Sequence, residues 1–303
     1  MMNERNLTLI KDAISGYLED SCNLSPASIN NRRTELSRFA RFCKKHEVTE
    51  SSRLTKNLVI GYLKSLKVAQ ITKITVLNVL SAFMNYLVDK EIILDNFAAS
   101  VKMPKARYPE SDFLTEHEVA IVFQKVVDIS SKKFVDRNLL IFNLLFQICL
   151  RATEVCDLKM EDVRLENGDP QIFVFRKGGK QVFIPLNEDL VKLFHVWLDC
   201  RKSFQGADLT EWVFLSSHGN QMTRNQVFLL VQNAIKKAGL IKNKMGPHIL
   251  RHSGGTLLSE RGATPQEVQF LMDHDSLNST QKYLHINKAR LRDTVNRMSQ
   301  IKG

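Results

Sequence analysis

Apolar residues recur at helical spacing through the first hundred residues of the chain. Ser25 followed by Pro26 is a typical helix start, with serine as the N-cap and proline in the first turn. Behind it, apolar side chains return every three or four residues, at Ile29, Leu36, Phe39, Ala40 and Cys43. The same spacing predicts a helix behind Thr55 over 58–66 and another over 76–87. This part of the chain is therefore predicted to be helical.

A proline-containing stretch separates this part from the rest of the chain. Residues 101–112 read VKMPKARYPESD, and each proline removes a backbone donor and disfavours helix at the residue before it. Thr115 and Glu118 then have the spacing of a capping box, which opens a new helix. We predict a helical domain over 1–103, a linker over 104–112 and a second domain over 113–303.

The second domain mixes helical and strand patterns. The β-rich runs QIFVF and QVFIPL flank RKGGK, whose two glycines indicate a hairpin turn between 171 and 186. Helical periods return over 190–197, 226–238, 250–261 and 265–272. The most apolar run, 139–150, is interrupted by Asn143 and Gln147 and is too short to cross a bilayer, so it predicts a buried core helix. The expected fold class is mainly α with a small β-sheet.

The net charge of the chain bears on which class of molecule it binds. The 303 residues carry a net charge of +11, and residues 1–110 hold 17 Lys+Arg against 11 Asp+Glu. A cationic excess in both parts of the chain indicates a polyanion bound from two sides, although many basic proteins bind nothing specific. The five cysteines form no CxxC pair and the N-terminus has no apolar signal segment. A reduced, cytoplasmic setting is expected.

Four segments carry polar residues that packing alone does not explain. Arg151 follows the apolar run directly, and Glu154 lies three residues later; an internal ion pair is the alternative to an anion site. The hairpin tip RKGGK offers lysines that either reach a substrate or are simply solvated. His248 and Arg251 share one face at the start of a helix, where free amides favour an anion.

The fourth segment, MDHDSLNSTQKYLHI, contains His274, Thr280, Tyr283 and His285. A metal site based on the i,i+4 pair His248 and His252 is disfavoured, because Ile, Leu and Arg lie between the two and no glutamate accompanies them. No carboxylate cluster suited to magnesium is apparent either, so no metal or other cofactor is expected.

Taken together, the four segments resemble the tyrosine recombinase (phage integrase) family, in the simpler form of its Xer-like and mobile-element members. The resemblance covers nearly the whole chain. It implies a helical core DNA-binding domain followed by a mixed α/β catalytic domain. It also implies six catalytic residues: Arg151, Lys177, His248, Arg251, His274 and Tyr283.

The resemblance also implies a reaction. Tyr283 would attack a phosphodiester and form a 3′-phosphotyrosyl intermediate, while two arginines neutralise the phosphate. His248 would take the phenol proton, Lys177 would protonate the leaving hydroxyl, and His274 would donate a hydrogen bond to the phosphate. The expected partner is double-stranded DNA, recombined by a homo-tetramer, or by this chain paired with a related recombinase, on two sites. The task would be integration, excision or dimer resolution. A type IB-like topoisomerase and a catalytically silent DNA-binding protein are the alternatives.

Several residues depart from the family pattern or leave a choice open. Cys149 and Asp273 stand where the family usually has glycine, and Asp273 places an anion near the expected phosphate site. Gly254 and Gly255 lie inside a predicted helix, at a cost of about 1 kcal/mol each. Lys177 is preferred over Lys180 as the hairpin lysine, depending on the hairpin register. The apolar stripe Leu291, Val295 and Met298 in the tail is expected to dock on a neighbouring protomer, with its own domain as the alternative.

Overall fold

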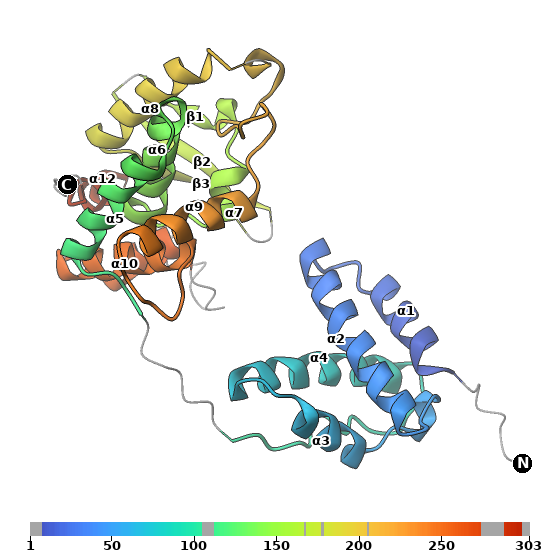
Figure 1. Ribbon diagram of the computed structural model, residues 1–303. Coiled ribbons are helices and arrows are strands. Elements are labelled where there is room, and N and C mark those ends of the chain that lie inside the picture. The colour runs from blue at the N-terminus through green and yellow to red at the C-terminus, as the bar shows by residue number, and fades with distance from the viewer. Residues whose placement is uncertain are drawn as a thin grey trace, which may run out of the picture. The chain divides into compact units, whose positions relative to one another are not determined.

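The protein divides into two compact units, Met1–Glu110 and Ser111–Gly303 (Figure 1). The computed structural model describes residues 8–104, 112–166, 168–176, 179–204, 206–273 and 288–298. Most of the predicted linker over 104–112 lies outside the described residues. The bounds of the two domains and of the linker between them therefore stay a prediction.

Unit 1 is built from helices that share one core (Figure 1). They are α1 (Ile10–Asp20), α2 (Pro26–Lys45), the short η1 (Ser51–Arg53), α3 (Lys56–Ser65) and α4 (Gln70–Asp89). The predicted caps are present: the Ser25 hydroxyl accepts from the backbone N–H of Ser28, and the Thr55 hydroxyl accepts from that of Leu58. Helix α1 was not singled out from the sequence.

Helix α4 is long and apolar enough to cross a membrane by length and composition alone. Its apolar side chains instead fill the core of unit 1, where Leu80, Phe83, Met84 and Leu87 are fully buried. It is therefore a core helix.

Unit 2 is mainly helical and holds one small sheet (Figure 1). Its larger helices are α5 (Glu116–Ile129), α6 (Val135–Gln147), α8 (Glu188–Arg201), α9 (Arg224–Lys237), α10 (Pro247–Glu260), α11 (Pro265–Met272) and α12 (Lys288–Asn296). The short α7 (Ala152–Cys156) and the 3-10 turns η2 (Lys132–Phe134), η3 (Met160–Asp162) and η4 (Ala207–Leu209) connect them. The predicted fold class is confirmed.

The sheet is antiparallel in the order β1 (Val163–Arg164), β2 (Gln171–Arg176) and β3 (Lys180–Pro185). Strands β2 and β3 form the hairpin expected from the two β-rich runs, and the last residue of β2, Arg176, pairs with Lys180. The capping box at the start of α5 is also present, with Thr115 and Glu118 each accepting the other's backbone N–H. The hairpin places Arg176 next to the end of α11.

The glycines of α10 have a packing reason. A Cβ atom on Gly254 would lie 1.9 Å from the carbonyl oxygen of Phe146 in α6, and one on Gly255 would lie 2.4 Å from the Sδ of Met272. Any side chain at 254 would therefore push α10 away from the end of α6. Because glycine has no side chain, α10 can pack closely against its neighbours, and this packing offsets the low helix propensity of the two glycines.

The C-terminal tail differs from the expectation. Leu291, Val295 and Met298 are fully buried in the core of unit 2, and the side-chain amide of Asn187 donates to the carbonyl of Val295 at 3.1 Å. The expected docking of this stripe on a neighbouring protomer is thus corrected: its own domain provides the apolar surface that the stripe needs.

Candidate functional site

The site begins where the chain leaves the apolar helix α6. Cys149 adopts a left-handed backbone conformation with φ of 54°, and the backbone N–H of Leu150 donates to the carbonyl of Leu144 at 3.1 Å, which closes the end of α6 before Arg151. Arg151 then stands at the start of α7, where its backbone N–H donates to Glu154 Oε2 at 2.7 Å. Its guanidinium donates to Glu154 Oε1 at 2.9 Å, so the ion pair considered from the sequence is formed.

Arg251 approaches the same carboxylate from α10. Its Nη1 lies 3.8 Å from Glu154 Oε2, and its terminal nitrogens donate to the carbonyl oxygens of Cys149 and Met272. Only 5% of the residue is exposed. The backbone carbonyls just before α7 and at the end of α11 therefore hold this guanidinium in one orientation.

A third arginine belongs to the cluster and was missed from the sequence. Arg176, at the end of β2, lies with its Nε 3.9 Å from Glu154 Oε1. Its terminal nitrogens donate to the carbonyls of Phe270 and Leu271 in the last turn of α11. Nothing local in the sequence distinguishes Arg176 from an exposed hairpin residue, because its hydrogen-bond acceptors lie more than ninety residues away.

Asp273 supplies a second carboxylate, which binds the more exposed arginine. It follows α11 with φ of 41°, again in the left-handed region. The Nη1 of Arg151 donates to Asp273 Oδ2, and its Nη2 donates to the main-chain oxygen of Asp273 at 2.6 Å. The anion expected near the phosphate site is therefore directly on Arg151.

The described part of this cluster has a small positive charge. Three guanidinium groups face the carboxylates of Glu154 and Asp273, which leaves one formal positive charge. Burial works against the charge of Arg151, but the hydrogen bond that it donates to Asp273 and the charge of Glu154 outweigh burial and raise the pKa of Arg151. Burial, reinforced by the neighbouring Arg151, lowers the pKa of Arg251 to about 10. The cluster therefore stays cationic at neutral pH.

His248 lies one turn before Arg251, at the N-terminus of α10, and its side chain reaches solvent. Partial loss of hydration, followed by the charges of Arg251 and Lys244, lowers the pKa of His248 below its usual 6.5. Arg151 and Arg224 contribute in the same direction. The imidazole is thus neutral at pH 7 and able to accept a proton.

The structure brings together three of the six residues expected from the sequence: Arg151, His248 and Arg251. Lys177, His274 and Tyr283 lie outside the described residues. Lys180, the alternative hairpin lysine, is exposed at the start of β3. Within the described ranges, no group of three or more His, Cys, Asp or Glu is placed to hold a metal ion. A reaction without metal stays a prediction.

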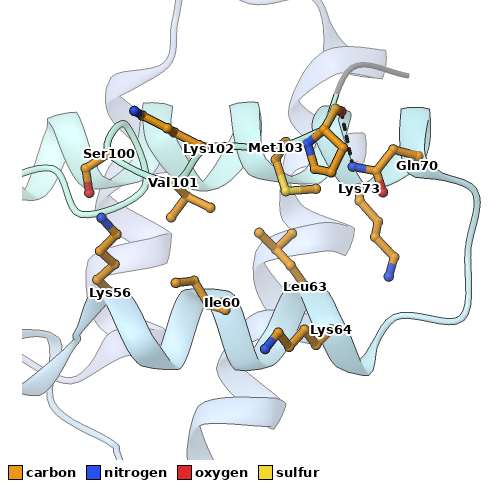
Figure 2. Close-up of a pocket in the computed structure, with 11 residues that line it drawn as sticks. Lys56, Ile60, Leu63, Lys64, Gln70, Lys73, Ser100, Val101, Lys102 and Met103 are labelled. Carbon is orange, nitrogen blue, oxygen red and sulfur yellow. Dashed lines mark hydrogen bonds between the residues drawn. The ribbon is translucent and has the colours of Figure 1, made fainter. Parts of the chain in front are cut away.

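Unit 1 carries a separate feature, a cleft of about 480 Å³ between α3, α4 and the segment that follows them (Figure 2). Figure 2 shows its apolar lining, in which Val101 and Met103 face Ile60 and Leu63 of α3. Gln70 closes one end by donating to the carbonyl of Pro104 at 3.4 Å. Four lysines also line it: Lys56, Lys64, Lys73 and Lys102. This cleft adds to the cationic character of unit 1.

Comparison with known proteins places these observations in a family. Residues 112–290 match the model of the phage integrase family. The chain belongs to that family. The tyrosine recombinase XerC of Halalkalibacterium halodurans is 30% identical over 285 residues, which cover 91% of this chain and 92% of that protein. The resemblance inferred from the sequence is confirmed, and the chain is a site-specific tyrosine recombinase of Xer-like type.

Solved structures agree on the fold. The XerH site-specific recombinase bound to its difH substrate is similar with a TM-score of 0.68 and 24% identity, covering 92% of this chain and 82% of that chain. A lambda integrase tetramer bound to a Holliday junction is similar with a TM-score of 0.70 and 18% identity, covering 91% and 80%. The similarity to the XerC recombinase does not favour the alternatives of a topoisomerase and a silent DNA-binding protein.

Proposed function

We propose that this recombinase breaks and rejoins DNA strands through the phenol oxygen of Tyr283, with the phosphate held beside Arg151 and Arg251. The observation that supports the proposal is that Arg151, at the start of α7, and Arg251, on α10, meet at the carboxylate of Glu154, with a neutral His248 one turn before Arg251 on the same helix. Fixed cations lower the barrier where negative charge grows on the phosphate. A phenol of ordinary pKa near 10 also needs a base, and His248 is in the right protonation state.

The two arginines have different parts in this scheme. The side chain of Arg251 is only 6% exposed and is fixed by two carbonyls, so it supplies a preorganised charge and its remaining N–H groups. The side chain of Arg151 is 32% exposed and meets the incoming phosphate first. The proposed site thus has one buried and one accessible cation.

Lys177 is proposed as the general acid that protonates the leaving 5′-hydroxyl, and His274 as a hydrogen-bond donor to the phosphate. Both assignments are supported by sequence adjacency, because Lys177 follows Arg176 and His274 follows Asp273, and those two residues belong to the cluster. The phosphotyrosyl bond keeps the energy of the original linkage, so a DNA hydroxyl reverses the step without ATP.

The DNA partner and the assembly complete the proposal. We assign residues 1–103 as a core DNA-binding domain, which the net charge of +6 over 1–110 and the lysine-lined cleft support. Residues 113–303 form the catalytic domain. We propose a homo-tetramer, or a pairing with a related recombinase, on two DNA sites in the cytoplasm. The lambda integrase tetramer on a Holliday junction is the structural precedent.

The test is capture of the covalent intermediate. Purified protein is incubated with a pool of nicked duplexes of random sequence, and protein linked to DNA is separated under denaturing conditions. We expect an adduct with wild type and with Tyr86→Phe, a matched control in unit 1, and none with Tyr283→Phe although that variant still binds DNA. Sequencing the captured DNA identifies the target.

An adduct of equal yield with Tyr283→Phe would remove Tyr283 from the mechanism. The captured site also separates recombination from relaxation. Joined products from two duplexes are expected for the recombinase, whereas relaxed circles without joined products would favour the topoisomerase reading.

A further inference from the structure

Arg176 is a buried cation whose bonding is incomplete. Its side chain is 4% exposed, and its Nη1 and Nη2 donate to the last carbonyls of α11. Its Nε makes no hydrogen bond to any described residue. Its Nη1 lies 3.9 Å from Asp273 Oδ1, close enough for charge attraction and too far for a hydrogen bond. Each terminal nitrogen carries two N–H groups, so one on Nη1 remains after the bond to Phe270.

Asp273 occupies the donors that a phosphate needs. Both terminal nitrogens of Arg151 donate to Asp273, one to its carboxylate and one to its main-chain oxygen. The Asp273 side chain is 24% exposed, so an incoming anion can reach this contact. A phosphodiester that pairs with Arg151 must displace the carboxylate, and the two like charges then repel each other unless the carboxylate finds another cation.

We propose that Arg176 is a positioning residue that retains the Asp273 carboxylate when the scissile phosphate takes its place on Arg151. This inference rests on the proposed function. Asp273 Oδ1 already faces Arg176, and a small rotation of the carboxylate brings it within hydrogen-bond distance of Nη1. The exchange keeps every charge partnered: phosphate on Arg151, carboxylate on Arg176 and Glu154 among all three guanidinium groups.

The rate of cleavage reports this exchange separately from DNA affinity. Most affinity comes from many phosphate contacts along the duplex, so displacement of one carboxylate chiefly changes the fraction of bound complexes that are competent to react. Single-turnover adduct formation on the captured nicked duplex therefore gives two numbers: the half-saturating DNA concentration and the maximal rate. Arg176→Gln should lower the maximal rate about tenfold or more, the effect of one charge-assisted hydrogen bond, with little change in half-saturation.

A second substitution distinguishes the proposed role of Arg176 from a merely structural role. Asp273→Asn removes the competing charge, and asparagine tolerates the left-handed conformation. We expect Arg176→Gln combined with Asp273→Asn to recover a maximal rate close to that of Asp273→Asn alone. If Arg176 only anchors the carbonyls of α11, the double variant stays as slow as Arg176→Gln, which overturns the inference.

Asp273→Asn alone gives an independent test should Arg176→Gln fail to fold. With the resident anion gone, its maximal rate should exceed that of wild type by a few-fold, and an equal or slower rate contradicts the inference. Asp199→Asn is the matched control and should behave as wild type, since Asp199 lies on α8 in an exposed pair with Lys202, which follows the helix. If wild type binds DNA yet forms no adduct, the proposed function itself fails; if wild type cleaves and the double variant is not rescued, only this inference fails.

Discussion

Replacing Gly254 by alanine should destabilise unit 2, whereas the same change at the neighbouring Gly255 should be close to neutral. The added Cβ at 254 would lie 1.9 Å from a backbone oxygen of Phe146, so α10 and α6 must separate by about 1 Å to reach a tolerable contact. At 255 the obstacle is the Sδ of Met272 at 2.4 Å, part of a flexible side chain that can rotate away.

The expected magnitudes follow from two opposing effects. Alanine gains about 1 kcal/mol over glycine inside a helix. Overpacking against backbone falls at the upper end of the usual range, about 3 kcal/mol, whereas a yielding methionine costs about 1 kcal/mol. Gly254→Ala should therefore lose about 2 kcal/mol of unfolding free energy, and Gly255→Ala should change it by less than about 1 kcal/mol.

Both tryptophans of the chain, Trp197 and Trp212, lie in unit 2, so intrinsic fluorescence during urea unfolding reports this unit selectively. The separation of α10 from α6 would also displace Arg251 from the carbonyl of Cys149, and adduct formation should fall with stability. Equal urea midpoints for the two variants would refute the packing argument, as would a Gly254→Ala protein more stable than wild type.

Two further substitutions probe the charges of the cluster. Glu154→Gln leaves three guanidinium groups without their shared buried anion and should lower the free energy of unfolding in urea by about 3 kcal/mol. Glu161 is exposed, so Glu161→Gln should lower it by less than about 0.5 kcal/mol. Equal urea midpoints for these two variants would show that Glu154 does not balance the arginines. Lys244→Gln removes a cation that lowers the pKa of His248, so that pKa should rise and the acid limb of the maximal cleavage rate should move to higher pH, with the rate at pH 8 unchanged. A limb that stays in place or moves to lower pH would argue against His248 as the base.

Local signals in the sequence were sufficient for much of the fold. Ser25, Thr55 and Thr115 cap their helices through contacts only three residues away, so the residue types alone indicate the helix starts. The hairpin follows from alternating strands around two glycines in the same way. Arg151, His248 and Arg251 were found through a combination of motifs, and the structure brings the three together.

Contacts between distant residues could not be obtained in this way. Arg176 meets the end of α11 ninety-four residues further on, and Arg151 meets Asp273 across 122 residues. The position of the tail was also mistaken, because an apolar stripe such as Leu291 and Val295 fits any apolar surface and its spacing does not say which one. Only the folded structure shows that the stripe packs against the core of unit 2.

The two departures from the family's glycines now have a common explanation in the backbone. Cys149 and Asp273 have φ of 54° and 41°, in the region where glycine is free and other residues pay roughly 1–2 kcal/mol. At Cys149 the side chain is buried, and burial raises the pKa of its thiol to about 12, so it acts as an inert apolar group. At Asp273 the same backbone position carries a carboxylate that binds Arg151.

The consequence of Asp273 is a site whose charges are nearly balanced before DNA arrives. A glycine there would leave three arginines facing Glu154 alone, with two formal positive charges, whereas Asp273 reduces the excess to one. One phosphodiester then neutralises the cluster completely, provided that Asp273 remains within it on Arg176. A site balanced in this way holds its buried guanidinium groups at lower desolvation cost and still binds a single phosphate, since the exchange requires only that one anion move from Arg151 to Arg176.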